Sequence, residues 1–398
     1  MTKGWTTKSF AEVCLSIEDG DWIEKKDQSN NGIRLIQTGN IGLGVYKDKA
    51  DKAKYISEET FQRLKCLEVV GGDILISRLP EPIGRACIVP NMPTKCITAV
   101  DCSILKLGKD VLPQWFIYYT QSSEYFKKTK EECSGTTRDR ITRKKLSVIT
   151  IPFPSIAEQQ RIVDILDAEF AKIDALKANA EKNLQNAKDL FQSAMKSMLY
   201  EPNGKMYRLQ DVCTDFGEYG MSVPSKAFDG IRYLRITDIT EWGDLNNECV
   251  SADTDVVEER YILKYGDILF ARTGATVGKT LVYDPSFGKC SYAGYLIRYR
   301  PNRNIVIPRM LYYITHSSQY YDWISSSQKK STLPNISAKL YNEYQLSLPT
   351  IEEQQVIVSR LDALNDRCKA LQENYTKTLA LCDDLKQALL RKAFNGEL

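Results

Sequence analysis

The chain has few of the residues that build metal sites. His316 is its one histidine, and its eleven cysteines are scattered with no Cys-x-x-Cys pair, whereas a zinc site needs clustered ligands. No run of about 18 apolar residues predicts a membrane span. The first residues, MTKGWTTKSF, lack the apolar core of a secretory signal. Free thiols suit a reducing compartment, so we expect a cytoplasmic protein without metal.

The net charge is also small. The 54 basic residues exceed the 51 acidic ones by only three, which does not by itself predict a nucleic-acid partner. The distribution is uneven, however, because eight basic residues lie between Lys127 and Lys145. Such a cluster is often a solvated face, and it becomes informative only if other features place it beside DNA.

Motifs for two kinds of cofactor are missing. The segment TGATVGKT, residues 273–280, resembles a phosphate-binding loop, but Gly274 and Gly278 enclose three residues where four are required. The next residues, LVYD, predict a strand, whereas a phosphate site needs a helix N-terminus there. No Asn/Asp-Pro-Pro-Tyr/Phe segment of an adenine methyltransferase occurs. We therefore expect this chain to bind neither ATP nor S-adenosylmethionine.

The chain does contain an internal duplication. Matching segments are offset by 194 to 199 residues, which indicates one duplication with small loop insertions. The pairs are FAEVC and LQDVC, GIRLIQTGNI and GIRYLRITDI, GGDILISR and YGDILFAR, YYTQSSEY and YITHSSQY, and IPFPSIAEQQRIVDIL and LSLPTIEEQQVIVSRL.

The first part of each copy predicts a mixed α and β head. Short apolar runs such as GDILIS, CSILKL, TLVYD and YLIRYR are bounded by turn residues and predict strands. The segments over 113–126 and 308–324 begin with proline, which the first turn of a helix tolerates, so each predicts one helix.

The second part of each copy predicts a long helix. Ser155 and Thr350 each precede a glutamate by three residues, the spacing of a capping box. About 40 residues without proline or glycine would span roughly 60 Å, so two such helices most simply pair with each other. The apolar seam is predicted at two sets of positions. They are Leu166, Ile173, Leu176, Ala180, Ala187, Leu190 and Ala194, and Leu361, Leu364, Cys368, Leu371, Tyr375, Thr378, Cys382, Leu385 and Leu389.

These patterns predict an α+β fold with two duplicated heads. We expect target heads over residues 1–150 and 201–345, and long helices over 151–200 and 346–398. If the helices form an antiparallel coiled coil, a pseudo-twofold axis relates the two copies.

The ordered set of segments, present twice, resembles the DNA-specificity subunit of type I restriction-modification systems. The resemblance covers essentially the whole chain. It rests on the opener P-S/T-I-x-E-Q-Q-x-I-V-x-x-L-D, the GDIL strand, and the Ile-x-x-Lys segments at 141–144 and 336–339. Each motif alone is weak, whereas the repeated order is specific.

The resemblance implies a non-catalytic subunit. Each head would be a target recognition domain that reads one half of an asymmetric bipartite site in double-stranded DNA. The helices would set the gap and dock two methyltransferase subunits. S-adenosylmethionine, ATP and Mg would be bound by those subunits and by motor-nuclease subunits, with no cofactor, metal or membrane contact for this chain.

Candidate DNA-binding residues follow from the repeat and from side-chain chemistry. Arginine and lysine neutralise phosphates, and glutamine or asparagine can pair with adenine. Equivalent loops follow the GDIL strands, and basic residues end both heads. The candidates are Gln37, Asn40, Arg78, Arg85, Arg138, Arg140, Lys144, Lys145, Arg272, Lys279, Lys329 and Lys330.

Two alternatives come from other functional classes. A two-headed coiled-coil scaffold would bind proteins without DNA specificity, and its binding would lack the steep salt dependence of a DNA complex. A nuclease would need a cluster of metal-binding carboxylates, and none stands out at repeat-equivalent positions.

Overall fold

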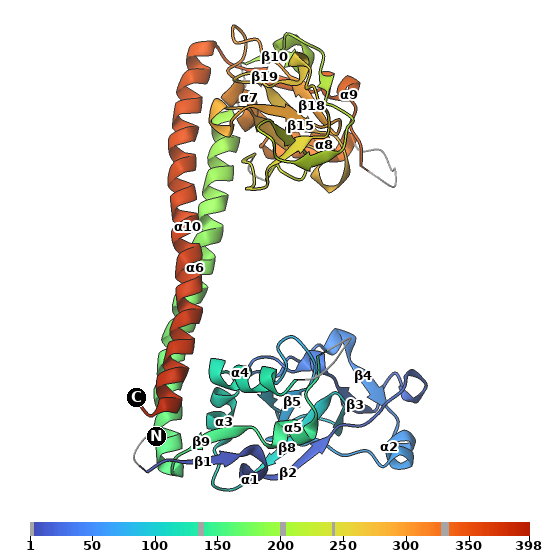
Figure 1. Ribbon diagram of the computed structural model, residues 1–398, viewed down its shortest axis with the longest axis vertical. Coiled ribbons are helices and arrows are strands. Elements are labelled where there is room, and N and C mark those ends of the chain that lie inside the picture. The colour runs from blue at the N-terminus through green and yellow to red at the C-terminus, as the bar shows by residue number, and fades with distance from the viewer. Residues whose placement is uncertain (1–3, 134–138, 200–203, 241–242, 328–333) are drawn as a thin grey trace. The chain divides into compact units, whose positions relative to one another are not determined.

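A computed structural model describes residues 4–133, 139–199, 204–240, 243–327 and 334–398. The chain divides into two compact units, one made of residues 1–181 and 377–398 and the other of residues 182–376. Each unit contains one head together with part of each long helix (Figure 1). The two units are therefore built from the same kinds of parts.

The first head is built on a four-stranded and a three-stranded sheet, and β1 pairs with β9 in a further two-stranded sheet. Its antiparallel sheet has the order β2-β8-β5-β6, and a second sheet has the order β4-β3-β7 with β3 parallel to β7. The strands are β1 (Thr6–Ser9), β2 (Cys14–Asp19), β3 (Ile33–Ile36), β4 (Lys54–Ile56), β5 (Ile74–Ser77), β6 (Ala86–Ile88), β7 (Cys96–Thr98), β8 (Cys102–Leu107) and β9 (Thr150–Phe153). The helices are α1 (Phe10–Val13), α2 (Glu58–Leu64), α3 (Pro113–Tyr119), α4 (Ser123–Glu131) and α5 (Arg143–Ser147).

The second head repeats the order of the main sheet and the parallel strand pair, and its additional strand β12 pairs with β14. Its main sheet has the order β11-β18-β15-β16, and β13 runs parallel to β17. The strands are β10 (Lys205–Arg208), β11 (Glu218–Tyr219), β12 (Ser225–Ala227), β13 (Arg232–Leu234), β14 (Val250–Ala252), β15 (Ile268–Ala271), β16 (Thr280–Val282), β17 (Cys290–Tyr292), β18 (Leu296–Tyr299) and β19 (Gln345–Leu348). The helices are α7 (Pro308–Ile314), α8 (Ser318–Ser327) and α9 (Ala338–Asn342).

The predicted mixed α and β heads are confirmed, but the segments that begin at Pro113 and Pro308 were each predicted as one helix, and each contributes to two. A break separates α3 from α4, and another separates α7 from α8. Ser122 caps α4 by accepting a hydrogen bond from the Tyr125 N–H at 3.2 Å, and Ser317 does the same for Tyr320 at 3.3 Å. Serine competes with the helix for backbone donors, so it starts a new helix here.

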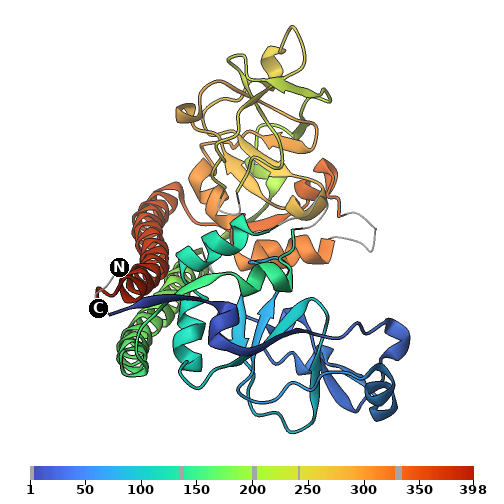
Figure 2. The same cartoon turned by 60° about the horizontal axis from the view of Figure 1, so that its bottom comes forward.

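The long helices are α6 (Ile156–Leu199) and α10 (Ile351–Asn395). They begin later than the predicted boundaries at 151 and 346, because the preceding residues form β9 and β19. Within each unit the two helices pack side by side (Figure 1, Figure 2). In the first unit Lys177 pairs with Asp383 and Asp174 pairs with Lys386, so the helices run antiparallel there.

The apolar seam differs in part from the predicted one. Leu166, Ile173, Ala180 and Ala187 are buried as expected, together with Leu361, Cys368 and Cys382. Leu176, Leu190, Leu371 and Leu385 are exposed instead, at 51, 53, 40 and 48%. Phe170, Phe191 and Met195 fill the buried stripe on α6. The strict heptad failed because the buried stripe also follows the contacts of each helix with its head.

The repeated Glu-Gln-Gln segment joins each long helix to its head. Gln159 is fully buried, and its side-chain oxygen accepts a hydrogen bond from the Leu112 N–H, 2.9 Å away, at the start of α3. Gln354 does the same for the Ile307 N–H at the start of α7, at 3.0 Å. A buried amide with satisfied hydrogen bonds fixes the geometry of a joint.

The predicted capping box is complete at α10. There Thr350 and Glu353 exchange hydrogen bonds with each other's backbone N–H. At α6 the Ser155 hydroxyl accepts from the Glu158 N–H, and the carboxylate of Glu158 binds Arg161. In the part of the chain that the structure describes, no helix combines the length and the hydrophobicity needed to span a membrane.

Candidate nucleic-acid interface

The loop after β5 presents Arg78, a predicted DNA contact. Its side chain is only 4% exposed, and Nη1 lies 2.9 Å from the carboxylate of Asp19 on β2. The guanidinium also donates to the carbonyl of Val100. Burial lowers the pKa of Arg78, and the neighbouring Asp19 opposes that shift. These contacts hold the Arg78 side chain inside the first head.

The equivalent Arg272 in the second head has different neighbours. The sheet register places Tyr219 of β11 where Asp19 stands in β2, since the next residues, Gly20 and Gly220, bond to equivalent carbonyls. The guanidinium carbon of Arg272 lies 4.8 Å from the centre of the Tyr219 ring. Its Nε donates to Asn335 at 3.4 Å. A half-buried arginine that rests on an aromatic ring keeps its charge available to an anion.

A second position reinforces this difference. The backbone N–H of Arg78 bonds to the carbonyl of Asp101, and that of Arg272 bonds to the carbonyl of Tyr295, so these partners are equivalent. Asp101 carries a carboxylate, whereas Tyr295 carries a phenol and is 61% exposed. The positions of Asp19 and Asp101 in the first head are thus occupied by Tyr219 and Tyr295 in the second.

Arg85 and Lys279 were predicted on the loops that follow. Arg85 is 9% exposed and donates to the carbonyls of Thr38, Ile41, Leu79 and Pro82. Burial lowers the pKa of Arg85. Through these four hydrogen bonds the Arg85 side chain joins two loops of the first head. Lys279 is half-buried immediately before β16, where strand pairing confirms the strand predicted at the end of TGATVGKT and in LVYD.

The basic end of the first head is partly paired. Arg140 forms a 3.2 Å ion pair with Asp101, and the ammonium of Lys145 donates to the Glu132 carbonyl at 2.7 Å. Lys144 is exposed and lines a hollow of about 320 Å³ with Arg143. The predicted contacts Arg138, Lys329 and Lys330 lie outside the described residues.

Gln37 and Asn40 frame one turn after β3. The Asn40 side-chain oxygen accepts from the Gln37 N–H at 2.9 Å, and its amide donates to the Lys47 carbonyl at 2.8 Å. Asn40 is 6% exposed, while Gln37 is half-buried. Asn40 therefore holds the turn, and Gln37 is the side chain that the turn positions.

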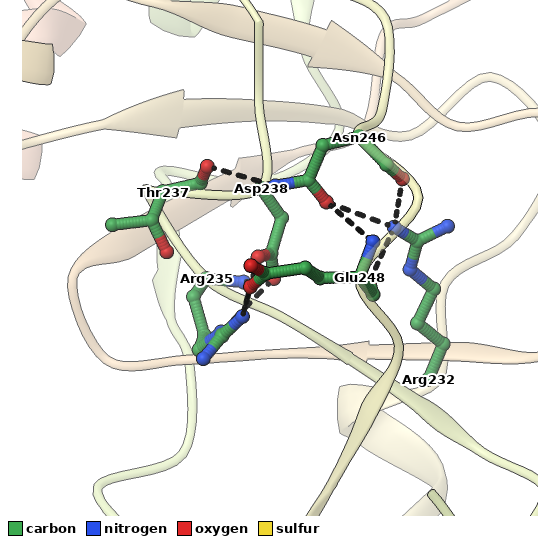
Figure 3. Close-up of polar contacts among 6 residues, drawn as sticks. All are labelled: Arg232, Arg235, Thr237, Asp238, Asn246 and Glu248. Carbon is green, nitrogen blue, oxygen red and sulfur yellow. Dashed lines mark hydrogen bonds and ion pairs between the residues drawn. The ribbon is translucent and has the colours of Figure 1, made fainter. Parts of the chain in front are cut away.

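The same turn follows β13, with Arg235 and Asp238 in place of Gln37 and Asn40. The Asp238 carboxylate accepts from the Arg235 N–H at 2.8 Å (Figure 3). The Asp238 carbonyl accepts from the Asn246 N–H, just as the Asn40 carbonyl accepts from Lys47. Arg235 and Arg272 both line one hollow of about 780 Å³ in the second head.

Arg235 is a residue that sequence reasoning missed. The alignment of GIRLIQTGNI with GIRYLRITDI already places Arg235 opposite Gln37, so the signal was present in the repeat. The aromatic partner of Arg272 had no such signal, because Tyr219 lies on β11, a strand distant in sequence that the sheet brings near the end of β15. The arrangement offers hydrogen-bond donors and positive charge to an anionic, base-bearing ligand.

Comparison with known proteins gives a consistent result. The family model described as type I restriction modification DNA specificity domain matches residues 2–186 and again residues 205–380. The StySPI specificity subunit of Salmonella potsdam is 24% identical over 429 residues, covering 100% of this chain and 90% of the relative. The EcoKI specificity subunit of Escherichia coli K12 is also 24% identical, with the same coverage.

Two solved structures have a similar fold. A chain from a structure on complex assembly and conformational transition of a type I R-M system superposes with a TM-score of 0.81 at 20% identity. It covers 100% of this chain and 99% of its own length. The HsdS subunit from Thermoanaerobacter tengcongensis has a TM-score of 0.56 at 21% identity, with coverage of 100% and 98%.

Proposed function

We propose, from the premise that this chain belongs to the type I restriction-modification DNA specificity family, that it selects the target of such a complex without catalysing a reaction itself. Each head reads one half of a bipartite site in double-stranded DNA. The long helices set the gap and dock two adenine methyltransferase subunits. Those subunits bind S-adenosylmethionine, and motor-nuclease subunits bind ATP and Mg.

One observation carries this proposal. The two heads share the order of the main sheet, a turn after the parallel strand and a loop after the GDIL strand, but differ in the side chains presented there. Gln37 corresponds to Arg235, and the surroundings of Arg78 differ from those of Arg272. Two heads with a similar backbone and different polar side chains are suited to two half-sites of different base sequence.

The polar side chains divide into two groups in this proposal. Arg272, Lys279, Lys144, Arg140 and Lys145 are exposed or half-buried, so they contact phosphates or bases. Arg78, Arg85 and Asn40 are buried with partners inside the head, so they position the loops that contact DNA. Phosphate contacts set the register of a protein on DNA, and base contacts select the sequence.

The helices supply docking surface for protein partners. Leu176, Leu381 and Leu385 are exposed on the helix pair of the first unit, and Leu190 and Leu371 on that of the second. Exposed leucines near a packed helix pair are suited to burial by another protein. Their presence in both units supports one methyltransferase subunit for each copy.

The test is to map adenine methylation. The chain is co-expressed with the methyltransferase of its own system in a host without adenine methylation, and the genome is read by long-read sequencing. A split motif with two different half-sites at one fixed gap is the expected result. An unmethylated genome despite a stable complex would contradict the proposal and favour a protein scaffold.

A salt series separates the scaffold from a DNA reader. The affinity of the complex for duplex DNA should fall steeply with salt. The logarithm of the binding constant should fall linearly with the logarithm of the salt concentration, with a slope near −0.9 for each phosphate neutralised. A scaffold would show no DNA affinity at any salt concentration while keeping its protein partners.

The gap has its own test. Four residues inserted near Ala180 in α6 would change the spacing of the half-sites and leave both half-site sequences unchanged, because the heads are not altered. Unchanged spacing with altered half-site sequences would show that the helices do not set the gap.

A further inference from the structure

We infer that Arg235 is a specificity-determining residue of the second head, and that it reads a guanine in the second half-site. This inference rests on the proposed function and deepens it. It concerns the turn after β13, which contains Arg235, Thr237 and Asp238 and is joined to Asn246 and Glu248 (Figure 3).

The backbone of this turn is held on both sides. The Asn246 side chain donates to the Thr237 carbonyl at 3.2 Å, and its N–H donates to the Asp238 carbonyl at 2.9 Å. Nη2 of Arg232 donates to the carbonyls of Asn246 and Glu248 at 2.6 and 2.8 Å. A base-reading side chain needs a fixed backbone of this kind, because discrimination depends on position.

The guanidinium itself is oriented by a buried carboxylate. The side chain of Asp238 is 1% exposed, and its two oxygens accept from Nε and Nη2 of Arg235 at 3.2 and 2.8 Å. Arginine has five N–H donors in a planar fork. Asp238 occupies the Nε and Nη2 edge of the guanidinium, so the Arg235 side chain is restrained before any ligand binds.

The other edge of the Arg235 guanidinium, formed by Nη1 and Nη2, remains available to a ligand. Nη1 of Arg235 makes no hydrogen bond to any other residue that the structure describes. Nη2 also meets Glu248 at 3.0 Å, but that carboxylate is 73% exposed. An ion pair with so exposed a partner contributes little and can be displaced. Nη1 and Nη2 together match the O6 and N7 acceptors of guanine.

The surroundings are consistent with a base-reading position. Arg235 lines the 780 Å³ hollow beside Arg272, and Ser222, Thr237 and Tyr295 add further polar groups to its wall. The repeat supplies independent support, because Gln37 occupies the same position of the same turn in the first head. Glutamine pairs with adenine and arginine with guanine, so one position would select different bases in the two half-sites.

The experiment uses the full chain in complex with its methyltransferase. The motif is first mapped for the wild type, and competition binding then measures all four base pairs at each position of the second half-site. Arg235→Gln is compared with Arg260→Gln, since Arg260 is an exposed arginine of the same head that pairs with Glu258 outside the hollow. Thermal unfolding of each variant monitors the fold.

The wild type should prefer guanine at one position of the second half-site by about tenfold to a hundredfold. Arg235→Gln should lose that preference at that position alone, and Arg260→Gln should keep it. An unchanged preference profile in a folded Arg235→Gln complex would overturn the assignment. Equal weakening for every sequence would also overturn it, since it would indicate a phosphate contact.

Failure of the proposed function and failure of the role of Arg235 give different results. A wild-type complex that binds all duplexes equally would overturn the proposed function and the role of Arg235 with it. A wild-type complex with a clear split motif that Arg235→Gln leaves unchanged would overturn only the role of Arg235. The first half-site serves as an internal control, because no residue of the first head is altered.

Discussion

The two heads share the strand order of their main sheets and one parallel strand pair, but an equivalent arginine has different neighbours in each head. In the first head Arg78 is buried against the carboxylate of Asp19. In the second head Arg272 lies against the ring of Tyr219 and is half-buried beside a hollow. A duplicated scaffold can thus keep a cation and change its surroundings through one residue on another strand of the same sheet, since Asp19 lies on β2 and Tyr219 on β11. The backbone is shared, and the partners decide the function.

The largest expected effect is a difference in the stability lost when Arg78 or Arg272 is replaced by alanine. Arg78→Ala removes a buried guanidinium that pairs with the half-buried Asp19 and donates to the Val100 carbonyl, so it should lower the free energy of unfolding of the first head by about 3 kcal/mol. Arg272→Ala should cost less than about 1 kcal/mol, because its side chain is less buried. Urea unfolding of both variants measures the difference. Equal losses would contradict the distinction between the two heads.

The next prediction concerns acid. His316 is buried in the second head, and burial lowers its pKa to about 4 from the usual 6.5. The folded head binds the proton more weakly than the unfolded chain, so stability is present above pH 6.5 and is lost as the pH falls toward 4. Between pH 7 and pH 5 the loss should be about 2 kcal/mol.

The first head supplies the matched control for that prediction. Gln121 stands at the position of His316, and its amide donates to the Ile117 carbonyl as Nδ1 of His316 contacts the Tyr312 carbonyl. His316→Gln should therefore remove this part of the acid sensitivity. The free energy of unfolding measured at pH 7 and pH 5 tests the change. If the variant lost as much stability between these pH values as the wild type, groups other than His316 would be responsible.

The smallest effect concerns the aromatic partner. Tyr219→Asp would place a carboxylate beside Arg272, as Asp19 stands beside Arg78, and should weaken DNA binding by the complex about tenfold. Tyr219→Phe keeps the ring and should bind within about twofold of the wild type. Fluorescence titration with duplex DNA measures both, and equal affinities for the two variants would refute the role of the ring.

Part of this comparison could be predicted from sequence. The repeat placed Arg78 opposite Arg272, and the Pro-x-x-x-Glu-Gln-Gln openers placed both long helices. The partners of the arginines could not be predicted, because Asp19 and Tyr219 reach them across a sheet from distant segments. The same holds for Gln159 and Gln354, whose role is a joint with the N-terminus of another helix. The exposed positions of Leu176 and Leu190 show how head contacts shift a heptad pattern.

The central claim is that two heads of one chain read two different half-sites. Competition binding by the methyltransferase complex tests it with four duplexes of equal length: the mapped motif, the motif with either half-site scrambled, and the motif with both scrambled. Each single scramble should weaken binding strongly, and the double scramble should approach non-specific affinity, at least about a thousandfold weaker than the motif. Equal binding of all four duplexes, or loss from only one half-site, would contradict the claim.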